Sequence, residues 1–182
     1  PVRYGFHGTL KAPFRLQEGR DVGELMAALD AYAGVRAPIT PLRLEVSRLG
    51  GFLALTPGGP ADELSGLAGE IVRHFDAFRA PASEAEIARR RPEQLTPSQR
   101  DHLFAWGYPY VFDAFRFHMT LTGRLEDAVA GTLLPELAEH FAPALAEPVA
   151  FDHLALFEEP ALGAPFACLR LVRLAAAAAA NQ

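Results

Sequence analysis

Two stretches of the chain share one pattern: RYGFHGTLK at residues 3–11 and FRFHMTLT at residues 115–122. Each contains a His-x-Thr motif, HGT at 7–9 in the first stretch and HMT at 118–120 in the second. Larger apolar residues alternate with polar ones in both, which is typical of a β-strand with one buried face. Residues two apart on a strand point to the same side, so each stretch presents an imidazole and a hydroxyl together.

The two motifs stand at equivalent points of a longer repeated pattern. Chance predicts only about 0.2 His-x-Thr pairs in a chain with six His and seven Thr, so two at matching places favour an internal duplication. The motif histidines are 111 residues apart, and the second strands of the two predicted hairpins, beginning at Phe52 and Phe166, are 114 apart. The order strand, helix, strand, strand therefore occurs twice and predicts two lobes related by a pseudo-two-fold axis.

Local signals place the elements of each repeat. In the first repeat we expect a helix capped by Asp21, a hairpin of strands at 42–46 and 52–56 around Gly50-Gly51, and a helix at 64–78 opened by Pro60. In the connector we expect short helices after Ser83 and Thr96. In the second repeat we expect a helix at 125–141, interrupted or restarted at Pro135, and strands at 149–158 and 166–174.

The predicted fold class is α+β, with two pseudo-symmetric lobes of antiparallel sheet, helices on their outer sides and a central cleft. A doubly wound parallel sheet is less favoured, because no Gly-rich strand-to-helix turn is present. The chain is expected to form a single bilobal domain, with repeats at about 3–79 and 111–174, a connector at about 80–110 and a tail at 175–182.

Composition narrows the class of protein. The formal net charge of −5 argues against a protein that holds long nucleic acid by bulk charge, but it allows a local basic site for a small anion. The single cysteine, Cys168, which we expect to be buried in a strand, excludes an internal disulfide and a cysteine zinc cluster. No apolar run of 18 residues and no signal peptide are visible, so the expected location is the cytoplasm, without a membrane partner.

Two imidazoles and two hydroxyls around one cavity suit a tetrahedral phosphate. In-line displacement at phosphorus needs a base for the attacking oxygen and an acid for the leaving oxygen, and histidine can serve as either near neutral pH. We therefore predict His7 and His118 as the acid–base pair, in an order that the sequence does not assign. Thr9 and Thr120 are predicted to donate to the non-bridging oxygens. This chemistry requires neither a metal nor a cofactor.

Cations on the same strand faces are candidates for neutralising the phosphate charge. Lys11 and Arg116 share the faces of the motifs, and Arg3 is a weaker candidate near the terminus. Tyr110 is predicted to stack on a sugar or base, although packing beside the proline turn explains it equally well. The expected partner is a small phosphorylated substrate, and the sequence gives no oligomeric state.

The chain resembles the two-histidine (2H) phosphoesterase superfamily, whose signature is a duplicated His-x-Thr/Ser motif in a two-lobed α+β fold. More narrowly, RYGFHGTLKAPF at 3–14, WGYPY at 106–110 and FRFHMTLTG at 115–123 resemble a bacterial branch of phosphonate-metabolism proteins. The resemblance implies metal-independent chemistry on cyclic phosphates or 2′-5′ phosphodiesters, with a ribosyl cyclic phosphate as the substrate expected for that branch. It spans about residues 3–174.

One departure and two alternatives accompany this hypothesis. The superfamily usually has a strand well before the first motif, whereas six residues precede His7, so either an N-terminal segment is absent from this chain or the first lobe is short of a strand. The alternatives are RNA-end processing, by cleavage of a 2′,3′-cyclic phosphate or 2′-5′ ligation, and a non-catalytic module that binds a phosphate ligand.

Overall fold

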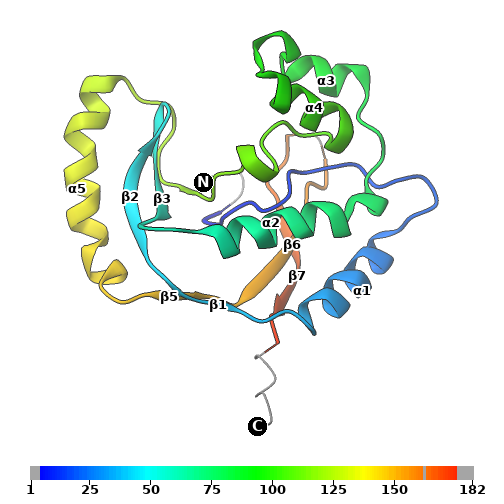
Figure 1. Ribbon diagram of the computed structural model, residues 1–182, viewed down its shortest axis with the longest axis horizontal. Helices are drawn as coiled ribbons and strands as arrows, with labels where there is room; N and C mark the ends of the chain where they lie inside the picture. Colours follow the sequence, from blue (N-terminus) through cyan, green and yellow to red (C-terminus); the bar gives the residue numbers. More distant parts are fainter. Residues whose placement is uncertain (1–4, 162, 176–182) are drawn as a thin grey trace. The chain divides into compact units, whose positions relative to one another are not determined.

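The computed structural model describes residues 5–161 and 163–175 of the 182-residue chain. Helices and antiparallel strand pairs alternate along it, so the predicted α+β class is confirmed (Figure 1). Its helices are α1 (Val22–Ala33), α2 (Asp62–His74), α3 (Glu84–Arg89), α4 (Pro97–Trp106) and α5 (Asp127–Leu145). Its strands are β1 (Ile39–Leu42), β2 (Leu44–Leu49), β3 (Phe52–Pro57), β4 (Met119–Thr120), β5 (Val149–Phe151), β6 (His153–Glu158) and β7 (Ala167–Arg173).

The described residues divide into two compact units. The first unit contains residues 5–8, 26–60 and 118–175 without 162, and therefore draws on both predicted repeats. The second unit contains residues 9–25 and 61–117. Along the chain the order α–β–β–β occurs twice, as α1-β1-β2-β3 and as α5-β5-β6-β7.

All strands belong to the first unit and pair antiparallel, in the sheets β1-β5, β2-β3-β4 and β6-β7. The predicted hairpin is confirmed as β2-β3, in which Leu49 pairs with Phe52 across Gly50-Gly51. Gly50 has a φ of +59°, a left-handed conformation that a side chain would oppose, so the glycine permits the tight turn. Leu53 and Ala54 of β3 are fully buried and form the centre of this unit's core.

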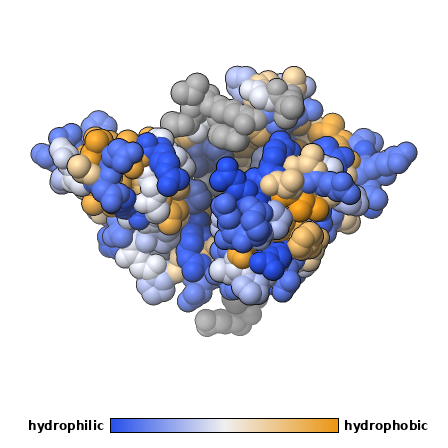
Figure 2. All heavy atoms as spheres, turned by 90° about the horizontal axis from the view of Figure 1, so that it is seen from above, coloured by the Kyte–Doolittle hydropathy of each residue, from blue (hydrophilic) through white to orange (hydrophobic). Residues whose placement is uncertain are grey.

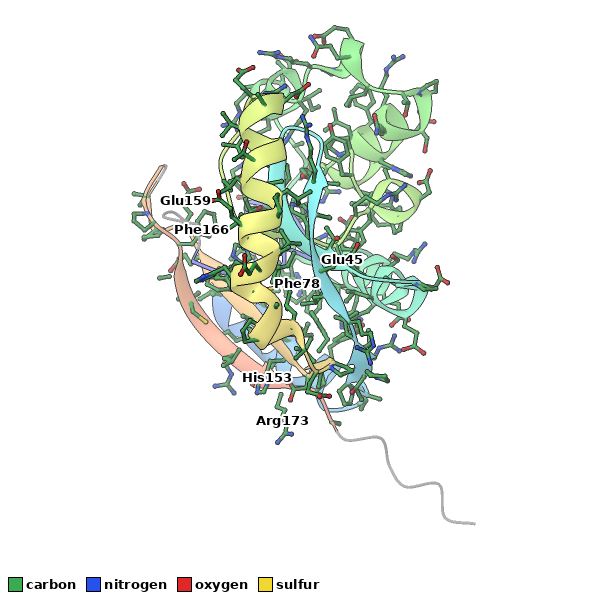
Figure 3. All side chains as sticks on the ribbon, turned by 90° about the vertical axis from the view of Figure 1, so that its left-hand side faces the viewer. Glu45, Phe78, His153, Glu159, Phe166 and Arg173 are labelled. Atoms are coloured by element: carbon green, nitrogen blue, oxygen red, sulfur yellow. The ribbon has the colours of Figure 1, made fainter. Side chains whose placement is uncertain are left out.

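Helix α5 packs along β2 and β3 (Figures 1 and 3). The interruption predicted at Pro135 is wrong, because α5 runs unbroken through both Pro135 and Pro143. Each proline removes a backbone donor and normally bends a helix. The residues beside Pro135 are leucine and glutamate, which favour helix strongly, and packing on the sheet stabilises the helix further.

The two motif strands are shorter than predicted. Among residues 5–11, the described part of the first stretch, only Gly8 pairs, through an isolated bridge, and in the second stretch only β4 is a strand. Gly5 has a φ of +70°, so extended strand backbone is interrupted at that residue. Burial alternates at the start of the second stretch, where Phe115 and Phe117 are buried and Arg116 is exposed, whereas residues 118–122 are all half-buried.

The predicted strand at 149–158 is divided at Asp152, since β5 pairs with β1 whereas β6 pairs with β7. His153 of β6 and Arg173 of β7 begin that second ladder and are labelled in Figure 3. Cys168 lies in β7 but is exposed, contrary to the expectation of burial. It lies beside a register shift in the β6-β7 pairing, which disturbs the alternation of inward and outward side chains.

Helix caps in the sequence are confirmed by side-chain hydrogen bonds. The Ser83 and Thr96 hydroxyls accept from the backbone N–H of Glu86 and Gln99 and complete capping boxes at α3 and α4. The apolar stripe predicted for the second helix is buried in the second unit through Leu64, Leu67, Ile71 and Phe75. Short-range signals therefore predict this unit's helices well.

On the face seen in Figure 2, hydrophobic side chains are interspersed with hydrophilic ones. No helix within residues 5–161 and 163–175 combines the length and the apolar character needed to cross a membrane.

An ion pair joins the start of the second unit to α3. Arg15 Nε and Nη2 each donate to the Glu86 carboxylate at 3.2 Å, and the Ser83 backbone N–H donates to it at 2.7 Å. These hydrogen bonds lower the pKa of Glu86 to about 2, and the largest contribution comes from Arg15. A carboxyl with a lowered pKa in the folded state stabilises the fold above its ordinary pKa and loses that contribution as the pH falls toward 2.

We therefore expect Glu86→Gln to lower the melting temperature most near pH 7, and the difference from the unsubstituted chain to shrink between pH 4.5 and pH 2. Thermal melts across that pH range measure it, with the exposed Glu84→Gln, in the same helical turn, as the control. A melting-temperature difference that does not vary with pH would contradict this electrostatic account.

Candidate functional site

The centres of the two His-x-Thr motifs pair with each other in the first unit. Gly8 and Met119 form an isolated antiparallel bridge. In the register that this bridge sets, His7 is opposite Thr120, and His118 immediately precedes β4. All three residues are half-buried. The bridge thus joins the backbones of two stretches whose histidines are 111 residues apart in the sequence.

Both histidine rings lie against phenylalanine rings of the same unit. The His7 ring centroid is 5.5 Å from that of Phe157 in β6, at an interplanar angle of 39°. The His118 ring centroid is 5.6 Å from that of Phe52 in β3, at 52°. In addition, Nδ1 of His7 is 3.5 Å from the Gly5 carbonyl oxygen. Each ring therefore packs against an aromatic side chain while its residue stays partly accessible.

Thr120 is held by the central sheet of the first unit. It pairs with Ala54, and Met119 pairs with Leu55, so β4 is the third strand beside the hairpin. Ala54 and Leu55 are buried, which gives β4 a rigid base. The position of Thr120 and of His118 immediately before β4 is therefore set by the hairpin β2-β3.

The remaining predicted site residues that the structure describes belong to the second unit. Thr9 is its first residue and is exposed. The Lys11 side chain is only 11% exposed, and its Nζ donates to the Val72 carbonyl oxygen at 3.0 Å and is 3.5 Å from Asp76 Oδ1. Burial lowers the pKa of the Lys11 ammonium, and Asp76 opposes this effect. Lys11 is thus bound to the end of α2.

Arg116 and Tyr110 are more accessible. The Arg116 guanidinium is exposed and donates from Nη1 to the carbonyl oxygens of Asp113 at 2.8 Å and Phe115 at 2.6 Å. The Tyr110 side chain is 46% exposed, and its ring lies edge-on to that of Tyr108 at 5.6 Å. Arg3 lies outside the described residues. Of the predicted site residues, the structure therefore places His7, His118 and Thr120 in the first unit, next to the Gly8–Met119 bridge.

Sequence reasoning missed the ring neighbours Phe52 and Phe157. Both belong to predicted strands, but alternation along one strand does not reveal which ring of another element it meets. Within residues 5–161 and 163–175, no group of three or more His, Cys, Asp or Glu side chains is arranged to hold a metal ion.

Two curated proteins are similar to the chain over most of its length. One, from Janthinobacterium sp. (strain Marseille), is named "Ribose 1,5-bisphosphate phosphokinase PhnN" and is 45% identical over 168 residues, covering 90% of this chain and 37% of the relative. The other, from Laribacter hongkongensis (strain HLHK9), has the same name and is 39% identical over 181 residues, covering 95% of this chain and 40% of the relative. The chain therefore spans about two fifths of the length of these relatives.

No solved structure matches the chain. The family described as "Protein of unknown function (DUF1045)" matches residues 9–167, a region that includes the second His-x-Thr motif. Since this match covers well over half of the sequence, the chain belongs to the DUF1045 family.

Proposed function

We propose that the chain is a cyclic phosphodiesterase of the two-histidine type, which hydrolyses a small cyclic phosphate by acid–base catalysis without a metal ion. The observation that best supports the proposal is the antiparallel Gly8–Met119 bridge. It joins the backbones of the two stretches, each of which carries a histidine, a residue type that can serve as acid or base, and the second of which also carries the Thr120 hydroxyl.

The proposed reaction is one displacement at phosphorus. One histidine takes a proton from water as the water oxygen bonds to phosphorus. The other protonates the ring oxygen as its bond to phosphorus breaks, which leaves a phosphate monoester and a free hydroxyl. Thr120 donates its hydroxyl proton to a non-bridging oxygen, and the sequence predicts the same role for Thr9.

The names of the relatives support a ribose phosphate as the substrate class. If a phosphate bridges O1 and O2 of ribose 5-phosphate, hydrolysis with O2 as the leaving oxygen gives ribose 1,5-bisphosphate, the compound in those names. We propose such a ribosyl cyclic phosphate as the substrate, within phosphonate metabolism.

The same names favour a second candidate, phosphoryl transfer from ATP. A phosphate-binding loop of the form G-x-x-x-x-G-K-[ST] needs a lysine after glycine. The only lysine, Lys11, follows Leu10, so the sequence contains no such loop. We therefore assign the kinase activity to the part of the relatives that this chain does not span.

The chain should open a ribose 5-phosphate 1,2-cyclic phosphate to ribose 1,5-bisphosphate, measured by ³¹P nuclear magnetic resonance. His7→Ala and His118→Ala should each lower kcat by about 10²–10⁴-fold, because each removes one partner of the proton transfers. His140→Ala, on the exposed side of α5, is the control that should retain activity. Wild-type rates in both motif variants, with intact folds, would exclude the mechanism.

The unsubstituted chain should also give a bell-shaped dependence of kcat/KM on pH, as catalysis by one acid and one base requires. Assays of 2′,3′-cyclic nucleotides and of ATP with ribose 1,5-bisphosphate, run in parallel, separate this function from RNA-end processing and from the kinase. Binding without turnover across the panel would favour the non-catalytic alternative.

Lys11 gives a separate prediction about stability. Lys11→Met should lower the free energy of unfolding by about 1–3 kcal/mol, because the Val72 carbonyl and Asp76 lose a partly buried donor. Denaturant titration measures this loss, and KM should change little. A large rise in KM at unchanged stability would instead support the sequence-based assignment of Lys11 to the substrate.

A further inference from the structure

The segment that follows Thr120 is joined to β3 by an unusual set of hydrogen bonds. The carbonyl oxygen of Leu53 accepts from two backbone donors, Leu121 N at 2.9 Å and Thr122 N at 3.2 Å. Regular pairing with β3 therefore ends after Thr120, and the backbone of the next two residues converges on one residue of that strand.

The side chain of Thr122 completes this junction. Its Oγ1 accepts from the Leu53 backbone N–H at 3.0 Å and donates to the Gly123 carbonyl oxygen at 2.8 Å. Leu53 is fully buried, so its N–H needs a partner within the protein. The regular pairing between β3 and β4 does not reach Leu53, so the Thr122 hydroxyl accepts this hydrogen bond instead.

Leu53 also connects this junction to the ring beside His118. Its neighbour Phe52 carries that ring, so fixing the Leu53 N–H fixes the backbone from which the Phe52 side chain projects. One residue further back, the Gly51 carbonyl oxygen accepts from Leu125 N at 2.8 Å. The hairpin tip is therefore tied to the chain after the motif on both sides of Phe52.

Thr122 shares the predicted motif face, which raises the question of whether it contacts substrate. A hydroxyl has one proton to donate, and that of Thr122 is given to Gly123. It is consequently not available for a phosphate oxygen in this arrangement, unlike the role predicted for Thr120.

We infer that Thr122 is a positioning residue, whose hydroxyl holds β4 and the Phe52 ring in the register that orients His118 and Thr120. The expected effect of Thr122 on catalysis rests on the proposed function. The orientation of His118 does not, because it is a property of the folded chain. The two can therefore be measured separately.

The test compares Thr122→Val, which keeps the shape but removes the hydroxyl, with Thr122→Ser, which keeps the hydroxyl. We expect Thr122→Val to lower kcat roughly 10- to 100-fold with little change in KM, because it misplaces a catalytic group. The kcat of Thr122→Ser should stay close to that of the unsubstituted chain. Thr132→Val, on α5, is the matched control, because that hydroxyl donates only within its own helix, to Ala128 O at 3.2 Å.

Imidazole resonances provide a readout that does not require turnover. Thr122→Val should shift the ring signals of His118 and leave those of His7 in place, and amide exchange at Leu53 should accelerate. If Thr122→Val does not fold, Thr122→Ala replaces it, since the smaller side chain admits water to the Leu53 N–H.

The outcomes separate the two claims. If the unsubstituted chain lacks cyclic phosphodiesterase activity, the proposed function fails, but a selective shift of the His118 ring still supports the positioning role. Unchanged kcat and unchanged His118 signals in the variant without the hydroxyl overturn the inference, whatever the activity of the chain. A rise in KM alone would make Thr122 a substrate contact and would also overturn it.

Discussion

The antiparallel contact between Gly8 and Met119 is the constraint on which the candidate site depends. These residues are the middle positions of the two motifs, 111 residues apart. Pairing of equivalent residues in opposite directions is what a local two-fold axis produces. Strands β1 and β5, which follow α1 and α5 in the repeated order of elements, also pair antiparallel with each other. Two such pairings favour the duplication that the sequence predicts.

Features that depend on neighbouring residues could be predicted from the sequence. The caps at Ser83 and Thr96 form because a hydroxyl reaches backbone donors within one turn. The hairpin forms at Gly50-Gly51 because glycine accepts the left-handed conformation there. The buried stripe of α2 follows from a spacing of three and four residues. The same local reasoning identified both motifs, although it does not establish what they do.

Features that depend on distant partners could not be predicted in this way. The length of a strand depends on how far its pairing continues, so alternation over residues 115–122 did not reveal that only Met119 and Thr120 pair with β3. Strand pairing also divides residues 149–158 at Asp152, because two different partners hold the two parts. For Lys11, alternation gave a side of the strand, whereas the helix end near Val72 determines where its ammonium group lies.

The position four residues after each histidine illustrates how the two motifs combine chemistry with anchoring. It is Lys11 in the first motif and Thr122 in the second, and each side chain binds backbone of its own unit: the Val72 carbonyl and the Leu53 N–H, respectively. A polar group engaged in this way is costly to release, because its partner would be left unsatisfied in a buried setting. At this position, therefore, both stretches carry a polar side chain that anchors the backbone within its own unit.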